Sequence, residues 1–193
     1  MIELITYNAA MRQLLKLHPA SRSLPIAQIE VEVGRPTANR LVLSYMLTGT
    51  IREICIPPVK TMARSDKLWQ QTCFEAFVRA PQHAGYYEFN FSPSTQWAAY
   101  HFSGYRSGMS PATEVEVVAI EVQSSLDGYT MHVSLELHGL PELLNGPWHL
   151  GLSAIVEDAT GAKSYWALAH PPGKPDFHQA DCFTLELAPD RPS

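Results

Sequence analysis

Two neighbouring strand-like segments carry acids and aromatic residues at a spacing that could hold a small polar ring. Successive side chains of an extended strand point to opposite faces, so Glu75 and Phe77 share one face of residues 72–79. On the next segment Glu88 and Asn90 lie opposite the aromatic residues at 87, 89 and 91. The C–H face of a sugar packs on aromatic rings, and a carboxylate accepts hydrogen bonds from its hydroxyls. With Trp69 just before the first segment, the pattern favours a binding site over a catalytic one and does not identify the ligand.

Composition limits the class of protein and its partners. The 193 residues are 46% hydrophobic and 17% charged, which predicts one domain over residues 1–193. The net charge of −5 and the lack of a basic cluster argue against nucleic-acid binding. No apolar run approaches the ~20 residues that span a membrane, and the N-terminus does not resemble a secretory signal. We therefore expect a cytoplasmic protein with a small-molecule partner; the sequence leaves its oligomeric state open.

The cysteines give no sign of a metal site. Cys55, Cys73 and Cys182 are far apart, and no CxxC spacing is present, so structural zinc is not expected. Cys73 and Cys182 are interpreted as small buried residues. We expect no resident cofactor.

Short segments separated by proline and glycine predict an all-β fold, an antiparallel β-sandwich of jelly-roll type with little helix. Asp127-Gly128 predicts a hairpin, because glycine readily takes a positive φ, and Asp158–Gly161 predicts a second turn. Residues 8–17 fit either a helix or a strand, and residues 140–144 fit one helical turn that begins at Pro141. The predicted strands are residues 27–33, 40–48, 53–56, 72–79, 86–92, 97–102, 114–123, 129–137, 149–157, 164–169 and 182–187.

The segment around Trp69 resembles the signature of family 9 carbohydrate-binding modules and of the wider DOMON-like superfamily. In that signature a tryptophan and a short polar step precede a strand with an acid, here residues 69–77. Residues 177–183 are similar to the closing motif of the family. Residues 129–137 resemble an amphipathic strand of the family, and residues 149–157 resemble its penultimate strand. The resemblance covers roughly residues 40–188.

The resemblance implies that two aromatic rings hold a saccharide while polar side chains bind its hydroxyls. By position, Trp69 and Phe177 would be the two plates and Glu75 a hydroxyl partner. This chain departs from the family where a basic donor is expected, because residues 88–90 hold no cation. Arg64, Lys174 or His178 could replace that donor, and Arg106 could pair with Glu75 or Glu88. The predicted ligand-binding residues are Trp69, Glu75, Phe177, Asn90, Arg106 and Lys174.

Three alternatives remain open at this stage. DOMON relatives include cytochromes that hold haem between methionine and histidine, and a soft sulfur with an imidazole suits iron. A glycosidase-like enzyme could use Glu75 with Glu88 as a carboxylate pair, if the strand register brings them together. The same sheet face could also bind another protein. The candidate haem ligands are Met109, Met131, His101, His170 and His178.

Overall fold

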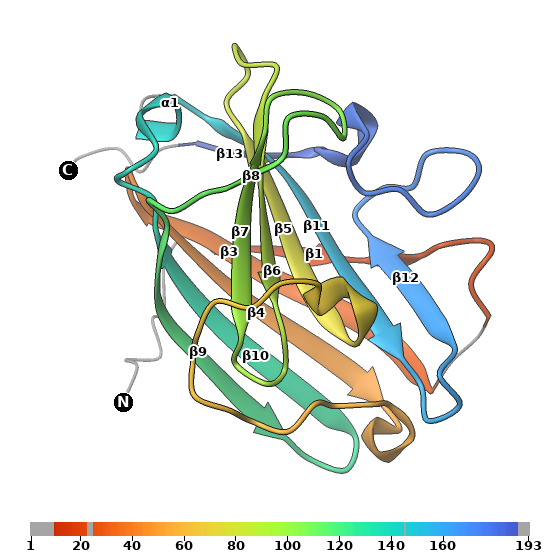
Figure 1. The fold of residues 1–193 in the computed structure, drawn as a ribbon. Helices are drawn as coiled ribbons and strands as arrows, with labels where there is room; N and C mark the ends of the chain where they lie inside the picture. Colours follow the sequence, from red (N-terminus) through yellow and green to blue (C-terminus); the bar gives the residue numbers. More distant parts are fainter. Residues whose placement is uncertain (1–9, 23–24, 145, 189–193) are drawn as a thin grey trace.

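The computed structural model describes residues 10–22, 25–144 and 146–188 as two antiparallel β-sheets packed face to face. Figure 1 shows the two sheets as layers of a sandwich, joined by loops at both ends. The only α-helix in the described part of the chain is α1 (Pro141–Leu144). The prediction of an antiparallel β-sandwich with little helix is therefore confirmed.

The first sheet has five strands and covers one side of the core. Its long strands alternate buried and partly exposed residues, as expected for a sheet with one face toward solvent. In spatial order the strands are β1 (Met11–Leu14), β3 (Ile26–Thr37), β4 (Arg40–Gly49), β10 (Gly128–Glu136) and β9 (Glu116–Ser124).

The second sheet has eight strands, and its middle strands are buried on both faces. Every residue of β6 and all but the last of β5 are buried, so something must cover the outer face of this sheet. In spatial order the strands are β2 (Lys16–Leu17), β12 (Lys163–Ala167), β11 (Trp148–Glu157), β5 (Cys73–Arg79), β6 (Tyr86–Phe91), β7 (Trp97–Phe102) and β8 (Ser110–Pro111), with β13 (Leu185–Leu187) paired to β11.

Two separate apolar clusters lie on the two faces of this second sheet. Phe74 and Phe89 point into the main core between the sheets, where Tyr45 and Trp148 also lie. Phe77, on the opposite face of β5, belongs to a smaller cluster on the outer face. That outer cluster also contains Tyr86, Ala98, Tyr100, Phe102, Ile155, Ala167, Phe177, Cys182 and Phe183. The loops that carry Phe177 and Phe183 thus cover part of the outer face.

Two predicted strands are wrong or too long. Residues 51–53 form the 3-10 turn η1 (Ile51–Glu53), and only Ile54 makes an isolated bridge, to Asp158. Pro57 and Pro58 follow directly, and proline cannot donate to a ladder. The predicted strand 182–187 is reduced to β13 because residues 180–182 form the 3-10 turn η3 (Ala180–Cys182). Its apolar residues Cys182 and Phe183 are buried in the outer cluster.

The remaining local predictions agree with the structure in type. Residues 11–17 form two short strands rather than a helix, β1 in the first sheet and β2 in the second; residues 8 and 9 lie outside the described part. The helical turn at Pro141 and the hairpin between β9 and β10 are both present. Gly128 does not have a positive φ, however, whereas Gly161 in the second turn does (83°). None of the helices in the described residues is long and apolar enough to cross a membrane.

Gly49 is expected to be required for the end of β4. Its φ is 150°, and an added Cβ would lie 2.2 Å from the carbonyl oxygen of Pro25. Gly49→Ala should therefore lower the free energy of unfolding by about 2 kcal/mol or more, measured by urea denaturation. Gly128→Ala is the matched control, because its nearest contact would be 3.3 Å away, at Ser125 Oγ. Equal losses in both variants would contradict this expectation.

Candidate functional site

A cavity of about 370 Å³ opens on the outer face of the second sheet. This volume lies within the range of small-molecule sites. Its floor comes from strands β12, β11, β5, β6 and β7, and its walls come from the loops around them. We call it the outer cleft; its lining residues are Trp69, Glu75, Glu88, Tyr100, Phe102, Arg106, Met109, Ile155, Tyr165, Pro175, Phe177 and His178.

Strand register explains why the sheet surface is hollow at this place. The row of paired residues that crosses the five strands is small or polar throughout: Ala167, Ser153, Glu75, Asn90 and Ala98. Larger side chains stand in the rows on either side. One row holds Tyr165 and Ile155, and the other holds Phe77, Glu88 and Tyr100. The sheet therefore forms a trough with an acid at its centre.

The two predicted aromatic plates line the same cleft. Trp69 lies on the 3-10 turn η2 (Leu68–Gln70) and is 37% exposed, and it packs edge-on against Tyr100 with ring centroids 6.4 Å apart. Phe177 comes from the loop after β12, is 7% exposed, and leans on Tyr165 at 6.3 Å. Tyr165 and Tyr100 are on β12 and β7, with three strands between them. The acids of β5 and β6 thus lie between two aromatic pairs.

Glu75 and Glu88 lie on neighbouring strands and on the same face, which answers the question of register that the sequence left open. Glu75 pairs with Asn90, and Glu88 is the next outward-facing residue of β6. Both are nearly enclosed, at 3% and 6% exposure. The Ser153 hydroxyl donates to Glu75 Oε2 at 3.0 Å, and the Asn90 amide donates to Glu88 Oε1 at 2.7 Å.

Burial is the main electrostatic influence on this acid pair. Desolvation, followed by the nearby charge of Glu88, raises the pKa of Glu75 to about 8. Desolvation also raises the pKa of Glu88, although the Asn90 hydrogen bond and Arg106 oppose the change. Two carboxyl groups so close and so buried cannot both ionise easily, so the pair holds a proton at neutral pH.

Asn90 and Lys174 do not line the outer cleft. Asn90 is fully buried beneath the acids, where its amide donates to Glu88 and the Cys73 thiol contacts its oxygen at 3.7 Å. It therefore positions Glu88 rather than reaching into the cavity. Lys174 is exposed, next to Gly173 in the loop before Phe177. The proline-rich sequence of this loop turns Pro175 and Phe177 toward the sheet instead.

Arg106 lines the cleft, but the predicted partner of its guanidinium is wrong. It binds Asp176, with Nη2 at 2.8 Å and Nε at 3.2 Å from Oδ1, rather than Glu75 or Glu88. Asp176 also accepts from Tyr105 and Gln179. Burial opposes ionisation there, yet these hydrogen bonds lower the pKa of Asp176 to about 2. The arginine is thus neutralised by an acid that the sequence did not single out.

His178 closes the cleft beside Glu88. Its Nδ1 hydrogen-bonds the Tyr86 hydroxyl at 2.7 Å, and its Nε2 lies 3.8 Å from Glu88 Oε2. Burial, with the charge of Arg106, lowers the pKa of His178 to about 4. The imidazole is therefore neutral at physiological pH.

Two backbone positions beside the cleft are strained. Lys67, which precedes η2, has φ 60°, and Arg106 has φ 49°. They are two of the three non-glycine residues with positive φ in the described part of the chain. Such strain gathers where a loop must hold a side chain in one place. Here the two positions lie in the loops that carry Trp69 and the guanidinium.

The lining residues that sequence reasoning missed come from distant strands and loops. Tyr165 and Ile155 are on β12 and β11, and Met109 and Pro175 are in loops. A signal for Ile155 and Tyr165 was present, since each alternates with core residues on its strand. The two-residue period alone does not predict that Ile155 and Tyr165 lie beside Glu75, because their position relative to β5 depends on the order of strands in the sheet.

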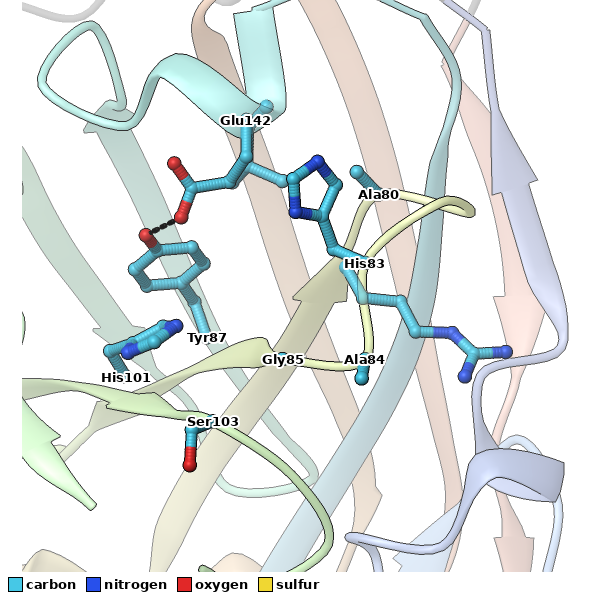
Figure 2. A pocket seen from close by; sticks show the side chains of 10 residues that line it. Ala80, His83, Ala84, Gly85, Tyr87, His101, Ser103 and Glu142 are labelled. Carbon is cyan, nitrogen blue, oxygen red and sulfur yellow. Dashed lines mark hydrogen bonds between the residues drawn. The ribbon is translucent and has the colours of Figure 1, made fainter. Parts of the chain in front are cut away.

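A second cavity of about 290 Å³ lies at the end of the β5–β6 hairpin, next to α1. Figure 2 shows the Tyr87 hydroxyl bound to Glu142, with His83 and His101 around them. The rest of the labelled lining is small, namely Ala80, Ala84, Gly85 and Ser103. Tyr87 and Glu142 use each other as hydrogen-bond partners, which leaves less polar capacity for a ligand in this cavity. The outer cleft is therefore the better candidate site.

The predicted haem ligands are dispersed. Met131 is buried in the main core, His101 lines the second cavity, and His170 packs against His18 and bonds the Lys16 carbonyl. Met109 and His178 both line the outer cleft. In the described ranges, no three His, Cys, Asp or Glu side chains come together as a possible metal-binding group.

The sequence matches no family model and no curated protein. Solved structures with a similar fold include the following three. The first is a proposed carbohydrate-binding protein from Bacteroides uniformis ATCC 8492, with TM-score 0.63, 12% identity, and coverage of 93% of this chain and 86% of that chain. A family 9 carbohydrate-binding module from Caldicellulosiruptor kristjanssonii follows in two complexes. With cellotriose the TM-score is 0.53 at 11% identity, covering 93% of this chain and 82% of that one. With glucose the TM-score is 0.51 at 11% identity, covering 93% and 86%. The chain therefore has the fold of the family 9 carbohydrate-binding modules.

Proposed function

We propose that the protein binds a saccharide in the outer cleft and does not transform it. The observation that carries this proposal is the convergence of Trp69, Glu75 and Phe177, far apart in the sequence, on one cavity. The shared fold with modules solved in complex with cellotriose and glucose supports the same class of ligand.

The cleft has the chemical features that a sugar requires. Trp69 and Phe177 supply apolar ring surface, on which the C–H groups of a pyranose pack. Glu75 and Glu88 supply carboxyl oxygens on the floor, and Arg106 supplies N–H groups on the wall. Because the acids are already held by Ser153 and Asn90, they lose little conformational freedom when a ligand binds.

Trp69→Ala is expected to weaken saccharide binding at least about tenfold, because truncation of an aromatic hot spot costs about 2 kcal/mol or more and about 1.4 kcal/mol corresponds to tenfold. Isothermal titration calorimetry with glucose, cellobiose and cellotriose measures the affinities. Trp69 is partly exposed, so the variant should fold. Leu126→Ala is the matched control, since Leu126 is a large apolar side chain, 87% exposed, in the β9–β10 turn of the other sheet. The proposal fails if no saccharide binds, or if Trp69→Ala binds as tightly as the parent.

A further inference from the structure

We propose that the preferred ligand of the outer cleft is a saccharide that carries a protonated amino group, which the two buried acids receive. This inference rests on the proposed function and narrows its ligand class. On the floor of the cleft, Glu75 and Glu88 both line the cavity, and both are more than nine-tenths buried.

The balance of charge in the cleft favours a cationic ligand. Arg106 is the only arginine or lysine among the described residues that line it, and this guanidinium is held by Asp176. His178 is neutral, because burial and Arg106 lower its pKa. Arg106 favours ionisation of both acids, but its hydrogen bonds go to Asp176 and not to Glu75 or Glu88. A ligand that brings an ammonium group would supply the missing charge.

The hydrogen bonds around the acids leave capacity for such a group. Ser153 donates to Oε2 of Glu75 and Asn90 donates to Oε1 of Glu88, so each acid has one oxygen held by the protein. Glu88 Oε2 lies 3.8 Å from Nε2 of His178, which is beyond a hydrogen bond. An ammonium group has three donors, which is enough to bind a free oxygen on each acid.

The aromatic walls suit the same ligand. A cation within about 6 Å of an aromatic face is attracted by the ring, most strongly by tryptophan. Trp69 with Tyr100 stands on one side of the acids, and Phe177 with Tyr165 stands on the other. Neutral sugars would use the rings but would bring no charge to the buried acids. An amino sugar uses both features.

Proton release should accompany binding. The acid pair holds a proton before the ligand arrives, because burial raises both pKa values. An ammonium group between the carboxyls favours their charged forms, so the proton leaves as the ligand enters. The other titratable groups around the pair are Cys73 on β5, Tyr86 on β6, Tyr100 on β7, Tyr45 from the facing sheet, and Arg106, Asp176 and His178 from the loops.

The test compares sugars that differ only in the amino group. Calorimetry at about pH 6, where a sugar amine is protonated, should show glucosamine and galactosamine, or one of them, binding about tenfold or more tighter than glucose and galactose. N-acetylglucosamine has the same substituent position without the charge and should not share the gain. Repeating the titration in buffers of different ionisation enthalpy should show about one proton released per amino sugar.

Isosteric variants identify the groups responsible. Glu75→Gln and Glu88→Gln should each remove the preference for the amino sugar, and Glu121→Gln, an exposed acid on the opposite sheet, should keep it. Circular dichroism confirms folding of each variant. Equal affinity for amino and parent sugars, with dependence on Trp69 retained, overturns this inference and leaves saccharide binding intact. Binding of no saccharide at all overturns both. A preference that survives both glutamine variants also overturns the inference.

Discussion

Replacing Arg35 by alanine is expected to lower the free energy of unfolding by about 3–5 kcal/mol. The side chain is buried, and its guanidinium donates to the carbonyls of Gly146 at 2.7 Å, Leu143 at 3.1 Å and Ala38. Its Cζ lies 3.7 Å from the ring centroid of Trp148. Burial lowers the pKa of Arg35 to about 10, which still leaves it charged at neutral pH. Its removal would take a donor from all three carbonyls, of which Leu143 keeps the indole N–H of Trp148.

Urea denaturation followed by tryptophan fluorescence measures the loss. The control is Arg52→Ala, because the Arg52 side chain is 80% exposed and its ion pair with Glu53 is long, with 4.0 Å between Nε and Oε1. That variant should stay within about 0.5 kcal/mol of the parent. A decrease in the free energy of unfolding of less than about 1 kcal/mol for Arg35→Ala would contradict this expectation. It would mean that water replaces the guanidinium at those carbonyls.

Glu75→Gln is expected to stabilise the protein above neutral pH, by an amount on the order of a few kcal/mol. The folded pKa of Glu75 is about 8, above the ordinary 4.5 that applies in the unfolded chain. Between these values the unfolded state releases the proton while the folded state keeps it. The favourable contribution of the neutral acid is therefore complete below about pH 4.5 and is lost as the pH rises toward 8. Glutamine keeps the shape and an acceptor for Ser153 but cannot ionise.

Free energies of unfolding measured from about pH 4 to pH 9 test this prediction. The difference between Glu75→Gln and the parent should grow with pH across that window and then level off. Glu121→Gln is the control, since Glu121 is exposed on β9 and should give a difference that changes little with pH. A difference for Glu75→Gln that is constant, or that falls as the pH rises, would show that the acid is not held in its neutral form.

Much of the fold could be predicted because the two-residue period is strong in this chain. The alternation in residues 72–79 placed Phe74 and Glu75 on opposite faces, and the structure has Phe74 in the main core and Glu75 in the outer cleft. The same alternation separated Phe89 from Glu88 on the next strand. Predictions failed where apolar residues are buried outside a strand. Cys182 and Phe183 looked like strand residues, but they cover the outer face from a turn and a loop.

The candidate site was only partly predictable, because period does not fix strand order or loop contacts. Of the residues predicted to bind a ligand, Trp69, Glu75, Phe177 and Arg106 line one cavity, and Asn90 and Lys174 do not. Their role in binding stays a prediction. The Arg106–Asp176 pair joins loops 70 residues apart. No local sequence pattern predicts a contact between residues so far apart. The contact depends on the fold, which places the loops that follow β7 and β12 over the same face of the sheet.

Alternate side chains of strand β5 face the main core and the outer side of the sheet, where the cleft lies. Because its side chains alternate strictly, the gain or loss of a single residue within it would turn Phe74 outward and Glu75 inward. In natural variation among relatives, the length of β5 should therefore stay constant. Insertions and deletions should collect in the loops around Trp69 and Phe177, where new specificities can arise without disturbing the sandwich.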